Sequence, residues 1–213
     1  VKDNLAFLGV CLVIVVAIFV VAGLTEKALR QKNSMARTNS PARRVALVGV
    51  FSAIAAVLML FELPLWFAPS FYELDFSEIP VLICAFAMGP VAGVATELCK
   101  VLLKLVLKGT TTAFVGDFAN FVVGCSLILP ASAVYSFKKT KKSAVIACIV
   151  GTLVMTVFGT AFNAVYLLPA FSKFYGMPLD AILAMGTEVN PLAKEGSIVS
   201  FVVACVAPLN LIK

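Results

Sequence analysis

Long, largely apolar segments constrain the fold of this chain more than any other feature. The segment from Leu5 to Leu24 has no charged residue, and further segments follow at 45–61, 91–107, 113–137 and 143–168. About 20 residues of α-helix cross the ~30 Å hydrocarbon core of a bilayer. Backbone groups in lipid must be paired within the protein, and the segments lack the alternation of a membrane β-barrel. We therefore predict an all-α integral membrane protein.

Composition supports this class and excludes several others. Hydrophobic residues make up 62% of the 213 positions and charged residues 13%, whereas soluble domains are about half apolar and about a quarter charged. The net charge of +6 comes mainly from two short basic clusters between apolar segments, which is typical of membrane topology and not of a nucleic-acid surface. The chain has no histidine, which excludes the usual His-ligated zinc or haem site, and we predict no metal.

Charge also predicts how the chain is threaded. The linker 25–44 and the lysines of 138–142 are basic and are expected on the cytoplasmic side, whereas the acidic loop 62–80 is expected outside. Residues 79–88 and 91–107 then form a hairpin that turns at Gly89-Pro90. The segment 169–196 is predicted to lie outside and to contain a short helix at Leu179–Met185.

The predicted division of the chain has three parts. Residues 1–24 form an extra N-terminal transmembrane helix, favoured over a cleaved signal peptide because the apolar segment is long and lacks a clear cleavage site. Residues 25–44 are a cytoplasmic linker, and residues 45–213 form a six-helix membrane domain. The last segment, Ile198–Lys213, is short for a full span, so we expect the last helix to be incomplete in this chain.

No motif for nucleotide hydrolysis or hydrolytic catalysis is present. The sequence lacks the phosphate loop G-x-x-x-x-G-K-[ST], the G-x-S-x-G nucleophile elbow and the H-E-x-x-H zinc motif. We therefore predict that the chain is not an enzyme, and that any uphill transport takes its energy from a partner chain or an ion gradient.

Ionisable residues inside apolar segments are costly and need an explanation. Glu97, Lys100 and Lys104 are spaced to share one helix face, and Asp117 begins the following segment. The set can line a path for a ligand or proton, or it can form internal ion pairs that hold the hairpin together. An intramembrane enzyme that uses Glu97 and Asp117 as paired carboxylates is a further alternative.

Polar groups near the outer side indicate a binding site. Asn163 lies late in its helix, and Asn210 and Lys213 share a face of the last segment, so the three would suit a planar polar heterocycle. The loop 71–80 adds aromatic side chains that could stack on a ring. Alternatively, Phe71, Tyr72 and Trp66 form an ordinary interfacial aromatic belt.

Five motifs in order resemble a known family. They are FYELDFSEIP (71–80), MGPVAG (88–93), GDFANF (116–121), NAVY (163–166) and APLNLIK (207–213). Together they resemble the riboflavin-binding S components of energy-coupling factor (ECF) vitamin transporters, over about residues 42–213. The resemblance implies a six-helix subunit that captures a vitamin outside, docks on a transmembrane T subunit with two cytosolic ATPases, and topples in the membrane during uptake.

The resemblance also implies roles for individual residues. Expected ligand contacts are the polar groups at the flavin ring, the loop over the ligand and the pocket wall: Asn163, Asn210, Lys213, Leu74, Asp75, Phe76, Thr112, Gly116 and Asn120. Small residues of the first core helix match the docking surface for the T subunit: Ala46, Gly49 and Ala53. Small residues four apart let helices approach closely.

We therefore predict a riboflavin-capture subunit without a cofactor, in a bacterial plasma membrane with several spans. An S component for thiamine or for flavin mononucleotide (FMN) is the first alternative. The second is the intramembrane enzyme, and the third is an assembly subunit that binds no ligand. The extra N-terminal helix lies outside the family pattern and has no assigned role.

Overall fold

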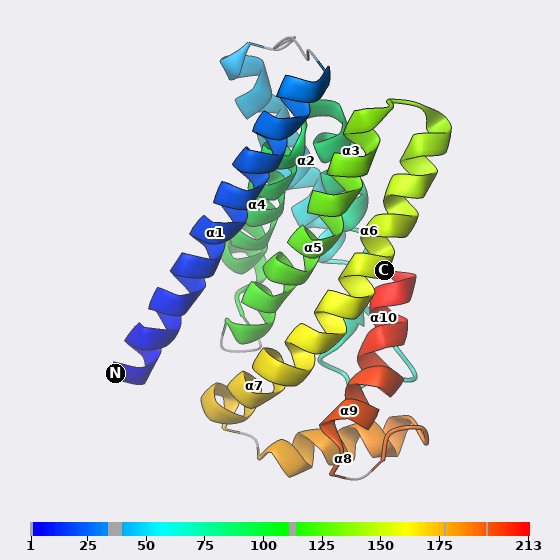
Figure 1. Ribbon diagram of the computed structural model, residues 1–213. Coiled ribbons are helices and arrows are strands. Elements are labelled where there is room, and N and C mark those ends of the chain that lie inside the picture. Colours follow the sequence, from blue (N-terminus) through cyan, green and yellow to red (C-terminus); the bar gives the residue numbers. More distant parts are fainter. Residues whose placement is uncertain (1, 34–39, 111–113, 177, 195) are drawn as a thin grey trace.

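The computed structural model describes residues 2–33, 40–110, 114–176, 178–194 and 196–213, and its regular structure is almost entirely helical (Figure 1). The long helices are α1 (Lys2–Asn33), α2 (Pro41–Met59), α3 (Glu78–Met88), α4 (Pro90–Lys108), α5 (Val115–Phe137) and α6 (Lys141–Phe162). They are followed by α7 (Leu168–Tyr175), α8 (Leu179–Val189), α9 (Ile198–Phe201) and α10 (Ala207–Ile212). Two π-helical turns, η1 (Asn163–Leu167) and η2 (Val202–Val206), join α6 to α7 and α9 to α10.

The helices confirm the predicted all-α membrane class. Among the described residues, four helices are long and apolar enough to cross a membrane: residues 7–31 of α1, α2, α5, and the run 141–174 that joins α6 to α7. Two further apolar helices are shorter, namely α3 and the run 198–212. The arrangement of one extra helix with six membrane-crossing helices stays a prediction.

Local sequence explains where several helices begin and end. Ser40 caps α2 by accepting the Arg43 N–H at 3.4 Å, and Pro41 occupies the first turn, where its missing N–H is not needed. The predicted turn between α3 and α4 is present. Gly89 has φ +100°, a conformation that suits a residue without a Cβ, and Pro90 starts α4.

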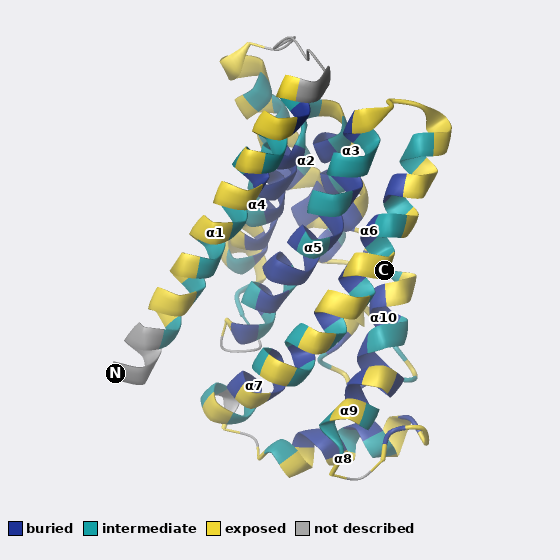
Figure 2. Ribbon diagram, in the orientation of Figure 1, coloured by how far each residue is buried: buried dark blue, intermediate teal, exposed yellow. Residues whose placement is uncertain are grey.

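Helix α5 forms the centre of the bundle and packs against α4 and α6. Figure 2 shows α5 as mostly buried, and Ile128 within it has no exposed surface. Glycine permits the close contact with the α3–α4 hairpin, because a methyl group at Gly93 would lie 2.6 Å from the Ala85 Cβ and 2.7 Å from Ile128. Small residues at such contacts let membrane helices pack at short range.

The N-terminal helix α1 lies along α4 and α5 and leaves its outer face exposed (Figures 1 and 2). Its Glu26 carboxylate pairs with Arg30, lies 3.3 Å from an Arg44 nitrogen, and accepts the Val91 N–H at 3.3 Å. One carboxylate thus connects α1 to the first turns of α2 and α4. The helix therefore packs on the rest of the bundle through an ion pair and a hydrogen bond as well as through apolar contacts.

The predicted linker boundary at residue 25 differs from the structure, because α1 continues past Leu24 to Asn33. The reason is local. Residues 25–33 contain good helix formers, and the i,i+4 pair of Glu26 and Arg30 supports this turn.

Helix α8 lies across the end of the bundle opposite the α5–α6 connection (Figure 1). Pro208 cannot donate to the Ala204 carbonyl oxygen four residues before it, so that oxygen lacks its usual partner. The side chain of Asn190, just after α8, donates to it at 2.9 Å and also to the Phe67 oxygen at 3.3 Å. Asn190 therefore joins the last helix and the α2–α3 connection at this end.

Candidate ligand-binding site

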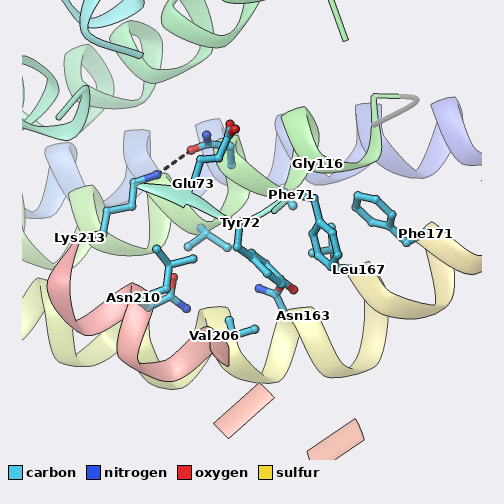
Figure 3. Close-up of a pocket in the computed structure, with 14 residues that line it drawn as sticks. Phe71, Tyr72, Glu73, Gly116, Asn163, Leu167, Phe171, Val206, Asn210 and Lys213 are labelled. Carbon is cyan, nitrogen blue, oxygen red and sulfur yellow. Dashed lines mark hydrogen bonds between the residues drawn. The ribbon is translucent and has the colours of Figure 1, made fainter. Parts of the chain in front are cut away.

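A pocket opens at the α8 end of the bundle. Its walls come from the α2–α3 connection, α5, the η1–α7 region and the η2–α10 region: Phe71, Tyr72, Glu73, Gly116, Ala119, Asn120, Val123, Asn163, Leu167, Phe171, Val206, Leu209, Asn210 and Lys213 (Figure 3).

Both π-helical turns contribute to the wall of this pocket. Each is followed by a proline, Pro169 after η1 and Pro208 after η2, and a proline disrupts the regular i→i−4 bonding before it. A π turn widens the helix by one residue and is common at functional sites. Asn163 and Leu167 of η1 and Val206 of η2 all line the pocket.

Asn163 is held on both sides of its amide group. The Tyr72 hydroxyl donates to its Oδ1 at 2.8 Å, and its own Nδ2 donates to the Gly159 carbonyl oxygen at 2.7 Å. Asn163 and Tyr72 are buried, at 4% and 8% exposure. Figure 3 shows the Tyr72 ring extending toward Asn163.

Asn210 faces the same glycine from the last helix. A methyl group at Gly159 would come within 2.7 Å of the Asn210 Nδ2, so the absent side chain leaves room for this amide. Within the described residues, that Nδ2 is buried and has no hydrogen-bond partner. A buried unsatisfied donor costs about 1–3 kcal/mol, which an acceptor on a ligand could offset.

Lys213 carries a positive charge to the pocket wall. Its ammonium donates to the Asn120 Oδ1 at 3.2 Å (dashed in Figure 3) and lies 3.4 Å from Asp75 and 3.6 Å from Glu78. Burial opposes ionisation of Asp75, but the charges of Lys213 and Lys100 outweigh it and lower the pKa of Asp75 to about 2. Asp75 therefore stays ionised and holds the lysine in place.

A buried ion network continues from this wall into the bundle. Lys100 has no exposed surface and lies 3.0 Å from Glu78 and 2.7 Å from Glu97. A separate pair joins Lys104 to Asp117 at 2.6 Å. These contacts are the internal ion pairs that the sequence allowed as one interpretation of its charged helix face. Glu97 and Asp117 bind different lysines, which does not support the alternative of paired catalytic carboxylates.

The other side of the pocket is apolar and aromatic. The Phe71 ring lies 4.7 Å from that of Tyr72 and 5.4 Å from that of Phe171, measured between centroids. Phe71 and Tyr72 therefore line the pocket, as the interpretation of this loop as part of a binding site required. Trp66 is 85% exposed and lies outside the pocket lining, consistent with an interfacial position.

An acidic pair lies at the rim. Glu73 hydrogen-bonds the Glu62 carboxyl group, and Glu62 also pairs with Lys108 at the end of α4. The strands β1 (Leu63–Pro64) and β2 (Glu73–Leu74) hold these segments together as an antiparallel pair. Partial burial, the bond to Glu62 and its negative charge raise the pKa of Glu73 to about 7.

The structure gathers five of the nine predicted contact residues in the pocket lining: Gly116, Asn120, Asn163, Asn210 and Lys213. Three others lie outside that lining. Leu74 pairs with Leu63 in the short ladder, Asp75 bonds Lys213 and the Ser77 N–H, and Phe76 is 48% exposed. Thr112 lies outside the described residues.

Several lining residues were not predicted as contacts. Examples are Glu73, Phe171 and Val206. Gly159 is not part of the lining, but it contacts the amide groups of Asn163 and Asn210. Phe171 and Val206 are apolar residues within largely apolar segments, so the sequence alone did not mark them as pocket residues. Among the described residues, no group of three or more His, Cys, Asp or Glu side chains could hold a metal ion.

The predicted docking residues lie on the outside of α2. Ala46, Gly49 and Ala53 are exposed, and a methyl group at Gly49 would meet no atom within 4 Å. Other positions of α2 are buried, for example Ala55 and Ala56. The exposed face is therefore open to another helix.

Comparisons with known proteins agree with one another. Residues 43–213 match the family described as ECF transporter, substrate-specific component. The riboflavin transporter FmnP of Bacillus subtilis (strain 168) is 30% identical over 172 residues, covering 80% of this chain and 84% of that protein. The riboflavin transporter RibU of Staphylococcus aureus (strain TCH60) is 34% identical over 171 residues, covering 80% and 82%.

A solved structure shows the same fold. It is described as the S component of a bacterial ECF transporter, with a TM-score of 0.63 and 33% sequence identity. The match covers 82% of this chain and 88% of the solved chain.

Proposed function

The chain belongs to the substrate-specific (S) components of ECF transporters, and from this premise we propose that it captures riboflavin in the pocket of Asn163, Asn210 and Lys213. As a member of this family it is a multi-pass membrane protein that serves transport and is not an enzyme. The observation that carries the riboflavin proposal is the lining of the pocket, which combines amide and ammonium groups with aromatic rings. The names of the relatives FmnP and RibU support it.

The chemistry of riboflavin matches both the polar and the aromatic residues of the lining. Its ring system has carbonyl and imine acceptors and an N–H group at the pyrimidine end, and two methyl groups at the benzene end. The amides of Asn163 and Asn210 and the ammonium of Lys213 are suited to the polar end. The rings of Phe71 and Phe171 are suited to stack on or enclose the apolar end.

The buried Nδ2 of Asn210 supports a ligand with acceptors in particular. Among the described residues it lacks a partner, and a carbonyl or imine acceptor of the flavin would supply one. Lys213 is held by Asp75 and Asn120 before any ligand arrives, so little side-chain freedom is lost on binding. Leu74, Asp75 and Phe76 belong to the loop that covers the ligand in this proposal. Asp75 orients Lys213.

Uptake itself requires partners in this proposal. The chain has no phosphate loop, so the energy comes from two cytosolic ATPase subunits through a transmembrane T subunit. The exposed small residues Ala46, Gly49 and Ala53 of α2 form the docking face. An S component selective for FMN or thiamine is the alternative function within the same family.

The test is an absorption and fluorescence spectrum of the protein purified in detergent, with any bound molecule released and identified. Yellow protein that releases riboflavin in a one-to-one ratio supports the proposal. Colourless protein that also fails to bind added riboflavin contradicts it. Competition with FMN and thiamine then ranks the alternatives by their dissociation constants.

Two variants test the site directly. Asn163→Ala and Lys213→Ala each remove a buried polar partner, which should weaken riboflavin binding by about 1–3 kcal/mol. Affinities within a factor of two of the wild type for both variants would show that the site is assigned wrongly.

A further inference from the structure

The hydrogen bonds of Asn163 restrict which way its amide group can face. A primary amide has two N–H donors on nitrogen and two lone pairs on oxygen. One donor is used by the Gly159 carbonyl oxygen at 2.7 Å, which cannot accept from the amide oxygen. The Nδ2 atom must therefore face Gly159, and Oδ1 must face Tyr72.

This orientation determines the role of the Tyr72 hydroxyl group. Because Oδ1 has no hydrogen to give, the hydroxyl must act as the donor in the 2.8 Å bond between Tyr72 and Asn163. The amide then retains one N–H and one lone pair for a ligand.

Tyr72 reaches Asn163 from a different part of the fold. The two residues are 91 positions apart, with Tyr72 in the α2–α3 connection and Asn163 at the start of η1. The Tyr72 N–H bonds the Pro69 oxygen at 2.9 Å, and its ring packs 6.4 Å from that of Phe201, which has no exposed surface. The position of the hydroxyl is therefore fixed by the loop and the core together.

We infer that Tyr72 is a positioning residue for substrate capture. Its hydroxyl holds the Asn163 amide in the orientation that receives the ligand, and it links that amide to the loop at the pocket mouth. This inference rests on the proposed function, because it requires Asn163 to bind riboflavin. Tyr72 does not need to touch the ligand through its hydroxyl, whose hydrogen is committed to Asn163.

The experiment is a double-mutant cycle between Tyr72→Phe and Asn163→Ala, read out as the riboflavin dissociation constant by fluorescence quenching. Tyr72→Phe keeps the ring and removes one buried hydrogen bond, so affinity should fall about tenfold. In the Asn163→Ala background the same substitution should change affinity less than about twofold, because its target is already gone.

Tyr166→Phe is the matched control. Tyr166 lies in the same π turn, but its hydroxyl faces Cys11 of α1 at 3.9 Å and it does not line the pocket. Its removal should leave riboflavin affinity within about twofold of the wild type. Unfolding temperatures of all variants without ligand show whether each one is folded and whether the bond only holds the loop.

Each remaining outcome has a distinct meaning. If the wild type binds riboflavin and Tyr72→Phe weakens binding equally in both backgrounds, the inference is wrong and the proposed function stands. The same holds if Tyr72→Phe binds like the wild type, or if the cycle shows coupling in unfolding temperature but none in affinity. If the wild type does not bind riboflavin, the proposed function and the inference both fail.

Discussion

The ammonium group of Lys100 lies 3.0 Å from a carboxylate oxygen of Glu78, and the two side chains are 0% and 3% exposed. This contact joins α4 to α3 inside the bundle. The same Glu78 carboxylate lies 3.6 Å from the ammonium group of Lys213 at the pocket wall. A buried ion pair adds little net stability compared with apolar packing, but removal of one partner is costly. The network therefore serves to hold the pocket lysine, and its charges depend on one another.

We predict that Lys100→Met destabilises the protein by about 3–5 kcal/mol, because Glu78 and Glu97 then lose their shared cation in a buried site. Glu97→Gln should cost less than about 1 kcal/mol. The network has three carboxylates and two ammonium groups, so loss of the Glu97 charge leaves it balanced. The measurement is the free energy of unfolding in mixed detergent micelles.

Lys142→Met is the control, since Lys142 is exposed at the start of α6. A change within about 0.5 kcal/mol is expected there. If Glu97→Gln proved as damaging as Lys100→Met, the charge balance described for the network would be wrong.

The rim of the pocket should respond to pH near neutrality. Burial and the bond to Glu62 raise the pKa of Glu73 to about 7 from the 4.5 of a free glutamate. A carboxyl group whose pKa is higher in the folded state than in the unfolded state stabilises the folded state. This contribution is complete below the pKa of the unfolded state and is lost as pH rises through 7. Asp75, with a lowered pKa of about 2, contributes stability that is lost only in acid, below about pH 4.

We therefore expect the unfolding temperature of the wild type to fall between pH 5.5 and pH 8.5. Glu73→Gln cannot ionise and should show a smaller fall over the same range. A wild type and variant with parallel pH profiles would exclude Glu73 as the titrating group. Scanning fluorimetry in detergent at constant ionic strength provides the measurement.

Much of the fold was predictable because the bilayer limits the possible structures. Apolar length identified the spans of α1, α2, α5 and α6, and the Gly89-Pro90 pair identified the α3–α4 turn. The ends were less predictable, since α1 continues through the basic segment 25–33, where Glu26 pairs with Arg30. Charge alone does not distinguish a helical extension from a linker.

The site was predictable only in its polar residues. Asn163, Asn210 and Lys213 stand out against apolar sequence, and the structure brings them to one pocket. The role of Gly159 was not accessible, because it depends on a contact with Asn210 from a helix that is distant in sequence. Likewise, the aromatic character of Tyr72 was visible but its bond to Asn163 was not.

Gly159 should be one of the most sensitive positions of the site. Its Cα faces Asn210, so the methyl group of Gly159→Ala would lie 2.7 Å from the Asn210 Nδ2 and force that side chain to move. We expect riboflavin affinity to fall at least about tenfold, as for loss of the Asn210 contact itself. Gly49→Ala makes the same chemical change in open space and should leave affinity unchanged. Unaltered binding by Gly159→Ala would mean that Asn210 has no role in the site.

The exposed face of α2 should govern assembly without affecting capture. Ala46→Leu, Gly49→Leu and Ala53→Leu add bulk on the outer face of α2, which lies away from the pocket lining. Close helix packing depends on small residues, so each variant should reduce co-purification with co-expressed T and ATPase subunits and reduce ATP-driven riboflavin uptake in proteoliposomes. The riboflavin dissociation constant of the isolated chain should stay within twofold. Ala161→Leu on the exposed face of α6 is the matched control, and equal loss of assembly there would show that α2 is not the specific docking face.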